Sequence, residues 1–171
     1  MVLQNPFATP PDKRVPARRF RGRLASPVTV WTAGGPQSRT GLTVSSLALA
    51  EGDPSLIVGL VNDTTPLYDT IVETERFVVH VLDASARRVA EVFAGLFPSP
   101  GGIFSGVKFH DGHYGPLLDD FPNRALCRLQ RIDEAGFQRI VRGVVDEFEV
   151  AVAEDPLVYF RGRFRTLSGG D

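Results

Sequence analysis

The stretch LCRLQRIDEAGFQRIVRGVVDEFEVAV, residues 126–152, decides the fold class of this chain. It contains two runs rich in β-branched and other apolar residues, 126–132 and 137–152, separated by the turn 133–136, which ends in glycine. This composition is typical of two strands joined by a hairpin. Because strands joined by so short a turn run in opposite directions, the stretch predicts an antiparallel sheet rather than a parallel sheet with crossover helices.

Shorter segments on both sides of this hairpin have the same β-type composition. Residues 55–61 are apolar nearly throughout, which suits a strand buried on both faces. Pro66 is a suitable residue for the first turn of a helix, and Gly95 is a suitable helix stop. The expected strands are 28–32, 40–46, 55–61, 76–82 and 157–160, the expected helices are 64–73 and 85–95, and residues 96–123 are expected to form a long irregular connection. The sum predicts a mainly β fold, a β-barrel with a few helices and an antiparallel, Greek-key-like order.

The composition limits the classes of partner. The 171 residues suit one domain, and 43% hydrophobic residues are enough for one core. A formal net charge of −1 gives no reason to expect a nucleic acid or an acidic membrane as a partner. The single cysteine, Cys127, cannot form an intrachain disulfide, and no signal peptide or membrane-spanning run is recognised. A cytoplasmic protein is therefore expected.

Three segments are expected along the chain. Residues 1–16, with four prolines, predict an extended N-terminal arm, residues 17–167 the folded domain, and residues 168–171 a tail. A basic stretch from Lys13 to Arg23 spans the junction of arm and domain. One interpretation is a patch that attracts phosphate. The other, favoured by the charge pattern alone, is the solvated face of a short helix before the first strand.

The sequence contains no complete catalytic motif. It lacks the glycine-rich Rossmann and P-loop motifs and the nucleophile elbow of hydrolases. His110 and His113 could offer two metal ligands, but a third is not in sight, so no metal is expected. His80 lies within a predicted strand and is expected to be a hydrogen-bonded core residue, and Cys127 is expected to pack as a small hydrophobic residue. The catalytic residues stay unknown, and any chemistry has to come from a cofactor.

Five segments, in order and over roughly residues 20–167, resemble the flavin reductase-like domain family. The segments ASPVTVWTA from Ala25 and GLTVSSL from Gly41 are similar to the first strand of that family and to the Gly-Met/Leu-Thr-x-Asn/Ser-Ser segment that follows it. The other three segments are DPSLIVGL from Asp53, ERFVVHVL from Glu75 and LVYFRGRF from Leu157. Each piece alone is a weak signal, whereas five pieces in order with fitting spacing are fairly specific.

The resemblance implies a split β-barrel of the FMN-binding type, which forms a homodimer and holds FMN, or FAD, near the subunit interface. It also implies an NAD(P)H:flavin reductase that takes NADH or NADPH as co-substrate and supplies reduced flavin to a monooxygenase. Carried over by position, the cofactor-binding residues are Thr43, Val44, Ser45 and Ser46 along the isoalloxazine ring and ribityl chain, and Thr64 and Thr65 at the flavin phosphate. The plainer alternatives are an ordinary strand over 43–46 and a simple helix cap at the two later threonines.

The chain departs from the family pattern at three places. The basic residue before the helix 64–73 is missing and Asp63 stands there, so Arg39 or an arginine of the partner subunit is expected to compensate. The histidine of the late hairpin is replaced by Gln138, and the histidine that precedes Arg161 in the family is replaced by Phe160. Gln138, Phe160 and Arg161 are the candidates on the nicotinamide side of the flavin.

Three functions follow from this pattern. The first is an FMN-dependent oxidoreductase, a flavin reductase whose protein part positions the nicotinamide against the flavin. The second is a slow or non-catalytic flavin-binding or electron-transfer protein on the same barrel, which the lost histidines favour. The third is a barrel that has lost its flavin and serves as a binding module. Retention of flavin and the rate of NADH oxidation discriminate between them.

Overall fold

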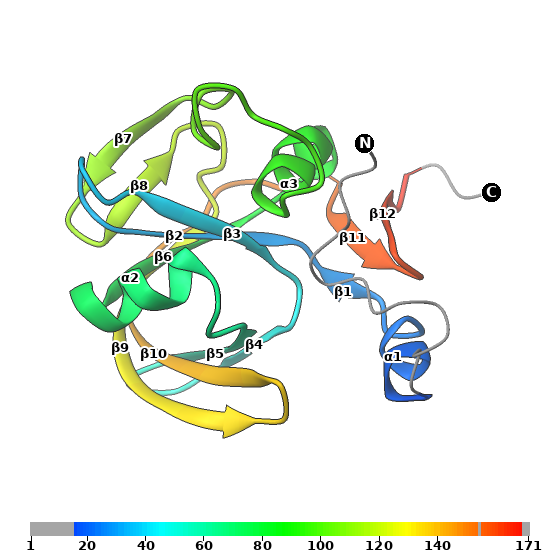
Figure 1. Ribbon diagram of the computed structural model, residues 1–171, viewed down its shortest axis with the longest axis horizontal. Coiled ribbons are helices and arrows are strands. Elements are labelled where there is room, and N and C mark those ends of the chain that lie inside the picture. Colours follow the sequence, from blue (N-terminus) through cyan, green and yellow to red (C-terminus); the bar gives the residue numbers. More distant parts are fainter. Residues whose placement is uncertain (1–15, 154, 169–171) are drawn as a thin grey trace.

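The computed structural model describes residues 16–153 and 155–168. Most of this part forms one curled seven-stranded antiparallel sheet in the order β3-β2-β6-β9-β10-β5-β4 (Figure 1). Its strands are β2 (Thr29–Ala33), β3 (Thr40–Val44), β4 (Leu47–Ala50), β5 (Leu56–Val61), β6 (Arg76–Val81), β9 (Arg124–Ala135) and β10 (Gln138–Glu149). The predicted mainly β, antiparallel split barrel is confirmed, and so is the 126–152 hairpin, which is the β9–β10 pair.

The sheet closes through two residues. β3 and β4 lie at opposite ends of the strand order, yet only Ser45 and Ser46 separate them in the sequence. The sheet must therefore curl until its two outer strands come together. The backbone N–H of Leu60 donates to the carbonyl of Ser46 at 2.8 Å and fixes this closure against β5. We call residues 43–46, which end β3 and lead into β4, the barrel seam.

Trp31 and Phe77 fill the interior of the barrel. Both side chains are fully buried, and their rings stack with centroids 4.9 Å apart and planes 11° apart. Glycines make room for them on the facing strands: a Cβ on Gly59 would lie 2.5 Å from the Trp31 ring, and a Cβ on Gly143 would lie 2.5 Å from the Phe77 ring. At the centre of the barrel core, two large aromatic rings therefore pack against two strand positions that are occupied by glycine.

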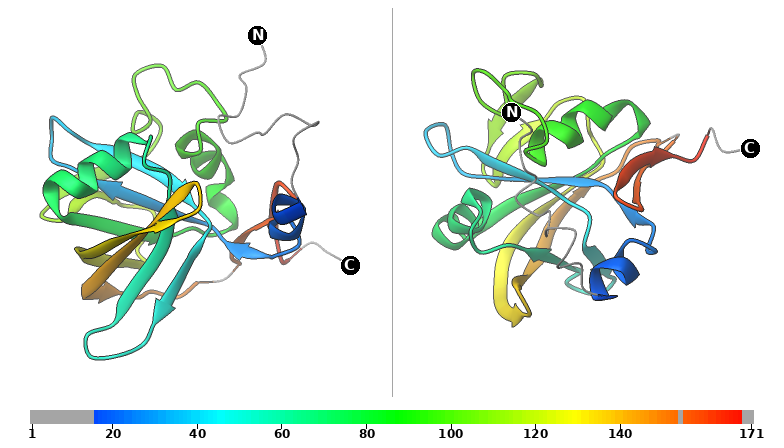
Figure 2. Two further views of the ribbon diagram at one scale, coloured as in Figure 1. Left: turned by 60° about the horizontal axis from the view of Figure 1, so that its bottom comes forward. Right: turned by 45° about the vertical axis from the view of Figure 1, so that its right-hand side comes forward.

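A second, three-stranded sheet stands beside the barrel in the order β1-β11-β12 (Figure 1). Its strands are β1 (Ser26–Pro27), β11 (Leu157–Phe160) and β12 (Arg163–Thr166). The short helix α1 (Pro16–Arg21) lies next to the β11–β12 hairpin in both views of Figure 2. The backbone N–H of Arg161 donates to the carbonyl of Gly22 at 3.1 Å, which holds the residue after α1 against the hairpin turn.

The remaining elements cover the barrel and a second core. They are α2 (Pro66–Thr74), a single 3₁₀ turn (Ala84–Ala86), α3 (Arg87–Phe93), β7 (Phe109–Gly112) and β8 (Gly115–Leu118). The second core lies between α3, the start of the barrel and the small sheet, and includes Val30, Phe93 and Leu157. None of the described helices has the length and apolar character needed to cross a membrane.

The structure corrects several expected bounds. The connection 96–123 is not irregular throughout, because it contains the β7–β8 hairpin, and the segment after Phe160 pairs as β12. The strand expected over 40–46 ends at Val44, and the separate strand β4 follows the seam. These short strands were missed because they lack a long alternating pattern. The expected arm lies outside the described residues except for Pro16, and the expected tail except for Ser168.

Candidate functional site

A cavity of about 610 Å³ opens between the barrel seam, α1 and the turn of the β11–β12 hairpin. Its volume is in the range of small-molecule sites. Its lining includes the seam residues Thr43, Val44, Ser45 and Ser46, the apolar side chains of Leu42, Leu60 and Phe164, the amides of Asn62 and Gln138, and the arginines Arg18, Arg19, Arg21, Arg23 and Arg161. Among the described residues, no Asp, Glu, His, Lys or Cys belongs to this lining.

The seam is held rigidly but leaves polar groups available. The hydroxyl of Thr29 donates to the carbonyl of Val44 at 2.5 Å, and that of Thr43 donates to the carbonyl of Ala90 on α3 at 2.7 Å. The hydroxyls of Ser45 and Ser46 are half-buried and have no hydrogen-bond partner within the described residues. The seam therefore presents two uncommitted hydroxyls to the cavity on a fixed backbone.

Thr64 and Thr65 lie in a smaller neighbouring cavity of about 310 Å³, which shares Leu42, Asn62 and Ala94 with the larger one. Thr65 is the N-cap of α2: its hydroxyl accepts from the backbone N–H of Tyr68 at 3.4 Å and donates to the carbonyl of Asn62 at 2.7 Å. The Thr64 hydroxyl donates to the Asn62 side-chain oxygen at 2.9 Å. The Thr65 hydroxyl therefore caps α2 and the Thr64 hydroxyl is bound to Asn62, while contact of either with a flavin phosphate stays a prediction.

Asp63 has a partner that the sequence did not indicate. Its carboxylate lies 2.9 Å from the guanidinium of Arg139, the second residue of β10. Arg139 reaches Asp63 because β10 pairs with β5, whose last residue, Val61, lies opposite Arg139. The acidic residue shortly before α2 is therefore paired within the barrel, and the expected compensation by Arg39 or by an arginine of the partner subunit stays a prediction.

Arg39 lies outside both cavities. It belongs to the turn between β2 and β3, and its guanidinium binds the carboxylate of Asp111 on β7 in two hydrogen bonds of 2.7 and 2.5 Å. The hydrogen bond to Arg39 lowers the pKa of Asp111. Arg39 therefore ties the β2–β3 turn to the β7–β8 hairpin, and its expected role toward a flavin phosphate stays a prediction.

Of the three candidates on the nicotinamide side, two line the larger cavity. Gln138, at the start of β10, and Arg161, in the β11–β12 turn, both contribute to its wall. Phe160 does not, although its neighbour Tyr159 does. Side chains of successive strand residues point to opposite faces, so the Phe160 side chain is expected to point away from the face on which the Tyr159 side chain lies.

The arginines of α1 and the nearby Arg23 line the cavity, although the sequence interpretation did not favour a binding role for them. The basic stretch was read in favour of a solvated helix, but Arg18, Arg19, Arg21 and Arg23 all line the cavity. The signal was present as a charge run. Whether these arginines line a cavity or face solvent depends on the contact between Gly22 and the β11–β12 turn, and no local sequence pattern predicts that contact.

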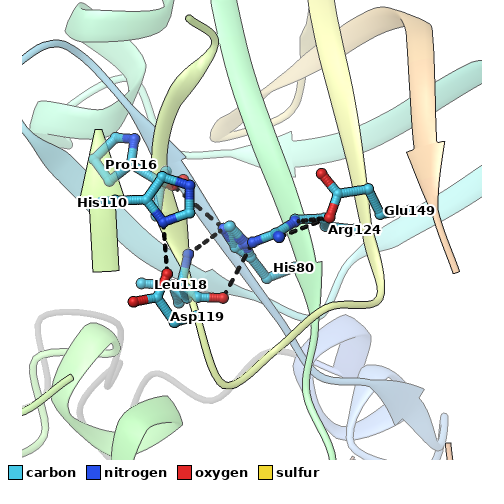
Figure 3. Close-up of polar contacts among 8 residues, drawn as sticks. His80, His110, Pro116, Leu118, Asp119, Arg124 and Glu149 are labelled. Atoms are coloured by element: carbon cyan, nitrogen blue, oxygen red, sulfur yellow. Dashed lines mark hydrogen bonds and ion pairs between the residues drawn. The ribbon is translucent and has the colours of Figure 1, made fainter. Parts of the chain in front are cut away.

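A second polar cluster lies under the β7–β8 hairpin and includes His80 (Figure 3). His80 is fully buried, and its Nε2 lies 3.4 Å from both the Pro116 carbonyl and the Leu118 backbone nitrogen. Burial, with a smaller effect of the Arg124 charge, lowers the pKa of His80 to about 3. The imidazole is therefore neutral and structural, as expected of a hydrogen-bonded core histidine.

Other reactive side chains are also structural. Cys127 is fully buried on β9, and burial raises the pKa of its thiol to about 12, which leaves it without thiolate character. Asp146 binds Arg128 at 2.6 and 2.8 Å and accepts a hydrogen bond from Tyr114 at 2.9 Å on the outside of the barrel. His110 is paired with Asp119 at 2.6 Å. None of these residues lines the larger cavity.

The curled antiparallel sheet and its seam define the class of split-barrel proteins, and comparison with known proteins identifies the family. Residues 21–168 match the family model described as the flavin reductase like domain, and the chain belongs to this family. The solved NADH:FAD oxidoreductase SgcE6 of Streptomyces globisporus superimposes with a TM-score of 0.79 at 27% identity, over 92% of this chain and 95% of that one.

Two curated relatives extend the comparison. The chain is 26% identical to the FMN reductase (NADH) RutF of Methylorubrum populi, over 97% of this chain and 82% of the relative. It is 30% identical to the reductase component of the 4-hydroxyphenylacetate 3-monooxygenase of Thermus thermophilus, over 85% of this chain and 91% of the relative. Both matches cover most of this chain.

Proposed function

We propose that this protein is an NADH-dependent flavin reductase that binds FMN, or FAD, in the larger cavity and supplies reduced flavin to a monooxygenase in the cytoplasm. The observation that carries the proposal is the cavity itself, which combines the family's seam residues with apolar and cationic walls. The printed activities of the relatives, FMN reductase, NADH:FAD oxidoreductase and monooxygenase reductase component, support the same class.

The residues of the cavity fit a flavin nucleotide. Leu42, Leu60 and Phe164 offer apolar surface for a planar ring system, and the free hydroxyls of Ser45 and Ser46 suit the polar ribityl chain. The arginines suit a phosphate, because a guanidinium binds phosphate oxygens in a bidentate manner. A bound flavin would supply the redox chemistry by accepting a hydride from reduced nicotinamide.

The protein's own part is binding and orientation. Within the described residues the cavity wall contains no carboxylate, imidazole, thiol or amine that could serve as a general acid or base. Hydride transfer needs no such group, provided that the two rings are held together and water is kept out. The rigid seam and Gln138, which both line the cavity, are the residues that we assign to this orientation.

We further propose that the protein is a homodimer. Large apolar side chains remain exposed on the single subunit: Leu49 on β4 is 51% exposed and Phe137 at the tip of the β9–β10 hairpin is 99% exposed. The family resemblance implies a dimer, and an interface over these side chains would remove their apolar surface from water. Size-exclusion chromatography with light scattering tests this directly, with twice the subunit mass as the expected result.

The activity is tested by mixing the purified protein with FMN or FAD and adding NADH or NADPH without oxygen. Bleaching of the visible flavin band at a catalytic rate, faster with NADH than with NADPH, is the expected result. Transfer of the product to a two-component monooxygenase that lacks its own reductase then tests the partner. Absence of bleaching with either nucleotide would overturn the assignment.

The replaced histidines favour a second candidate, a flavin carrier or electron-transfer protein with slow NADH oxidation. Gln138 stands in the cavity wall where the family carries a histidine. Tight retention of FMN together with slow bleaching would favour this candidate. In that case the variant Gln138→His is expected to raise the bleaching rate, whereas Gln130→His, on the exposed outer side of β9, serves as the control.

A further inference from the structure

Resting on the proposed function, we propose that the arginines of the larger cavity bind the diphosphate of the nicotinamide dinucleotide co-substrate. We call this group the cavity arginines: three come from α1, one follows it and one lies in the β11–β12 turn, namely Arg18, Arg19, Arg21, Arg23 and Arg161. NADH and NADPH share the diphosphate, so the assignment concerns what both have in common. It makes the site selective for a dinucleotide over a dihydronicotinamide without phosphate.

Most of the cavity arginines lack a negative partner among the described residues. Four of them form no ion pair with any described carboxylate: Arg19, Arg21, Arg23 and Arg161. No described Asp or Glu lines the cavity either. Arginines elsewhere on the barrel lie against carboxylates, as Arg128 does against Asp146. A diphosphate supplies the missing negative charge and offers the guanidinium groups oxygens that they can bind in pairs.

The cavity arginines are held in place by backbone contacts. The β11–β12 turn has Arg161 at φ 51° and Gly162 at φ 78°, the left-handed pair that a tight two-residue hairpin requires. The Arg161 N–H donates to the carbonyl of Gly22 at 3.1 Å, and the Arg23 N–H donates to the carbonyl of Phe20 at 2.8 Å. The end of α1 is thereby fixed to the turn, so arginines far apart in the sequence line one cavity.

Two ligands of the proposed function carry phosphate, the flavin and the nicotinamide dinucleotide. The flavin phosphate is expected at the start of α2, beside Thr64 and Thr65, which line the smaller cavity. Within the described residues, no arginine lines that smaller cavity, whereas the cavity arginines all line the larger one. The expected flavin phosphate and the cavity arginines therefore belong to different cavities, which leaves these arginines to the co-substrate.

The larger cavity is also where the reacting rings are expected. The seam and Gln138, which we assign to the orientation of the rings, line it together with the cavity arginines. In a nicotinamide dinucleotide, a single ribose separates the nicotinamide ring from the diphosphate. A nicotinamide ring held against the flavin ring in this cavity therefore brings its diphosphate into the same cavity, where the guanidinium groups can bind it.

The kinetic test compares two hydride donors with FMN as the flavin, so that only the donor can carry a diphosphate. NADH has one, whereas N-benzyl dihydronicotinamide has the same hydride-donating ring without phosphate. In Arg19→Gln/Arg21→Gln and in Arg161→Asn, we expect kcat/KM for NADH to fall at least about tenfold, mainly through KM, because a charge-assisted hydrogen bond contributes about that factor. The value for the benzyl donor should stay unchanged, and added salt should lower only the value for NADH.

A binding measurement tests the same assignment without turnover. ADP-ribose retains the diphosphate of the dinucleotide and lacks the nicotinamide ring. Isothermal titration calorimetry should show that the unchanged protein binds ADP-ribose and that both arginine variants bind it at least about tenfold more weakly. The affinity for FMN, measured by quenching of flavin fluorescence, should be the same in all three proteins.

The matched control is Arg165→Gln. It removes the same charge from the same hairpin, at an exposed position on β12 outside the lining of the cavity. ADP-ribose binding and kcat/KM for NADH should both stay unchanged in this variant. An equal fall in Arg165→Gln and Arg161→Asn would show that the general charge of the hairpin, and not the cavity, is responsible, and would overturn the assignment.

Further outcomes separate this inference from the proposed function. The inference alone is overturned by an equal fall of kcat/KM for both donors, by a loss of FMN affinity in the arginine variants, or by failure of the unchanged protein to bind ADP-ribose. It is also overturned if these variants lose affinity for FAD and keep kcat/KM for NADH, because the diphosphate bound is then that of the flavin. Reduction of FMN by neither donor overturns the proposed function, and the inference with it.

Discussion

Gly59 shows how a single position sets the barrel's interior. It lies on β5 directly against the indole of Trp31, where a Cβ would approach a ring carbon to 2.5 Å. Substitution Gly59→Ala therefore forces the ring to move in a closely packed core, and we expect the free energy of unfolding to fall by about 1–3 kcal/mol. Urea denaturation followed by tryptophan fluorescence measures this, since Trp31 is the one tryptophan of the chain.

The matched control is Gly35→Ala in the β2–β3 turn. A Cβ there meets nothing within 4 Å, and the residue does not have a left-handed φ. The free energy of unfolding should change by less than about 1 kcal/mol. Equal decreases in the free energy of unfolding in the two variants would show that the close approach of Gly59 to Trp31 does not cause the destabilisation.

His80 makes the stability depend on pH. In the unfolded chain its pKa returns to the ordinary value of 6.5, whereas in the folded protein the pKa is about 3. Between these values the unfolded chain binds a proton that the folded chain does not. The free energy of unfolding should therefore fall as the pH is lowered from about 6.5 towards 3, by up to about 1.4 kcal/mol per pH unit.

The range between pH 6.5 and about 5 isolates this effect. Hydrogen bonds lower the pKa values of Asp111, Asp146 and Asp155 in the folded protein, and the stability that this contributes is lost progressively only below about pH 5. Urea titrations at a series of pH values should show a slope that flattens in His80→Gln and persists in His113→Gln, a loop variant. An unchanged slope in His80→Gln would contradict the assignment.

At the scale of elements, a substitution at the start of α2 tests whether Thr65 caps the helix or binds the flavin. Thr65→Ala removes the side-chain acceptor for the Tyr68 N–H, and such losses cost about 0.5–2 kcal/mol. We expect a lower midpoint of urea denaturation with unchanged m-value and unchanged FMN affinity. A variant as stable as the unchanged protein but unable to bind FMN would show that Thr65 serves the ligand.

Element recognition from the sequence succeeded where a periodic pattern is long or a cap is explicit. The β9–β10 hairpin and α2 were predicted because each has its pattern and its stop signal in consecutive residues. The β7–β8 hairpin was missed because its strands have four residues each, with glycine, proline and charged residues among them. Such short strands are stabilised by tertiary contacts such as the Arg39–Asp111 ion pair, which local patterns do not encode.

The candidate site was predictable in part for the same reason. The segment 43–46 could be singled out because it is continuous in the sequence, and it lines the larger cavity, while its contact with a flavin stays a prediction. The arginines of this cavity combine residues near 20 with a turn at 161, so a charge run alone could not distinguish a cavity wall from a solvated face. The ion pair of Arg39 with Asp111, 72 positions away, could not be predicted from the local sequence.

At the scale of the whole molecule, a ligand in the cavity should join the seam to α1 and the small sheet. Ligand that binds only the folded state stabilises it by mass action, by about 2.7 kcal/mol at one hundred times the dissociation constant. For a domain of this size FMN should raise the melting temperature by about 5–10 °C. Differential scanning fluorimetry read through tryptophan measures this, and riboflavin at equal concentration should raise it less.

The pairing of β1 with β11 has a consequence for biosynthesis. Ribosomes deliver α1 and β1 first, but their partners, the segment 157–166, emerge more than a hundred residues later. Domains fold as units during synthesis, and distant pairings form late. The nascent barrel can thus assemble around Trp31 before the segment 157–166 is available, so we expect the cavity beside the seam to be completed only after the barrel has formed.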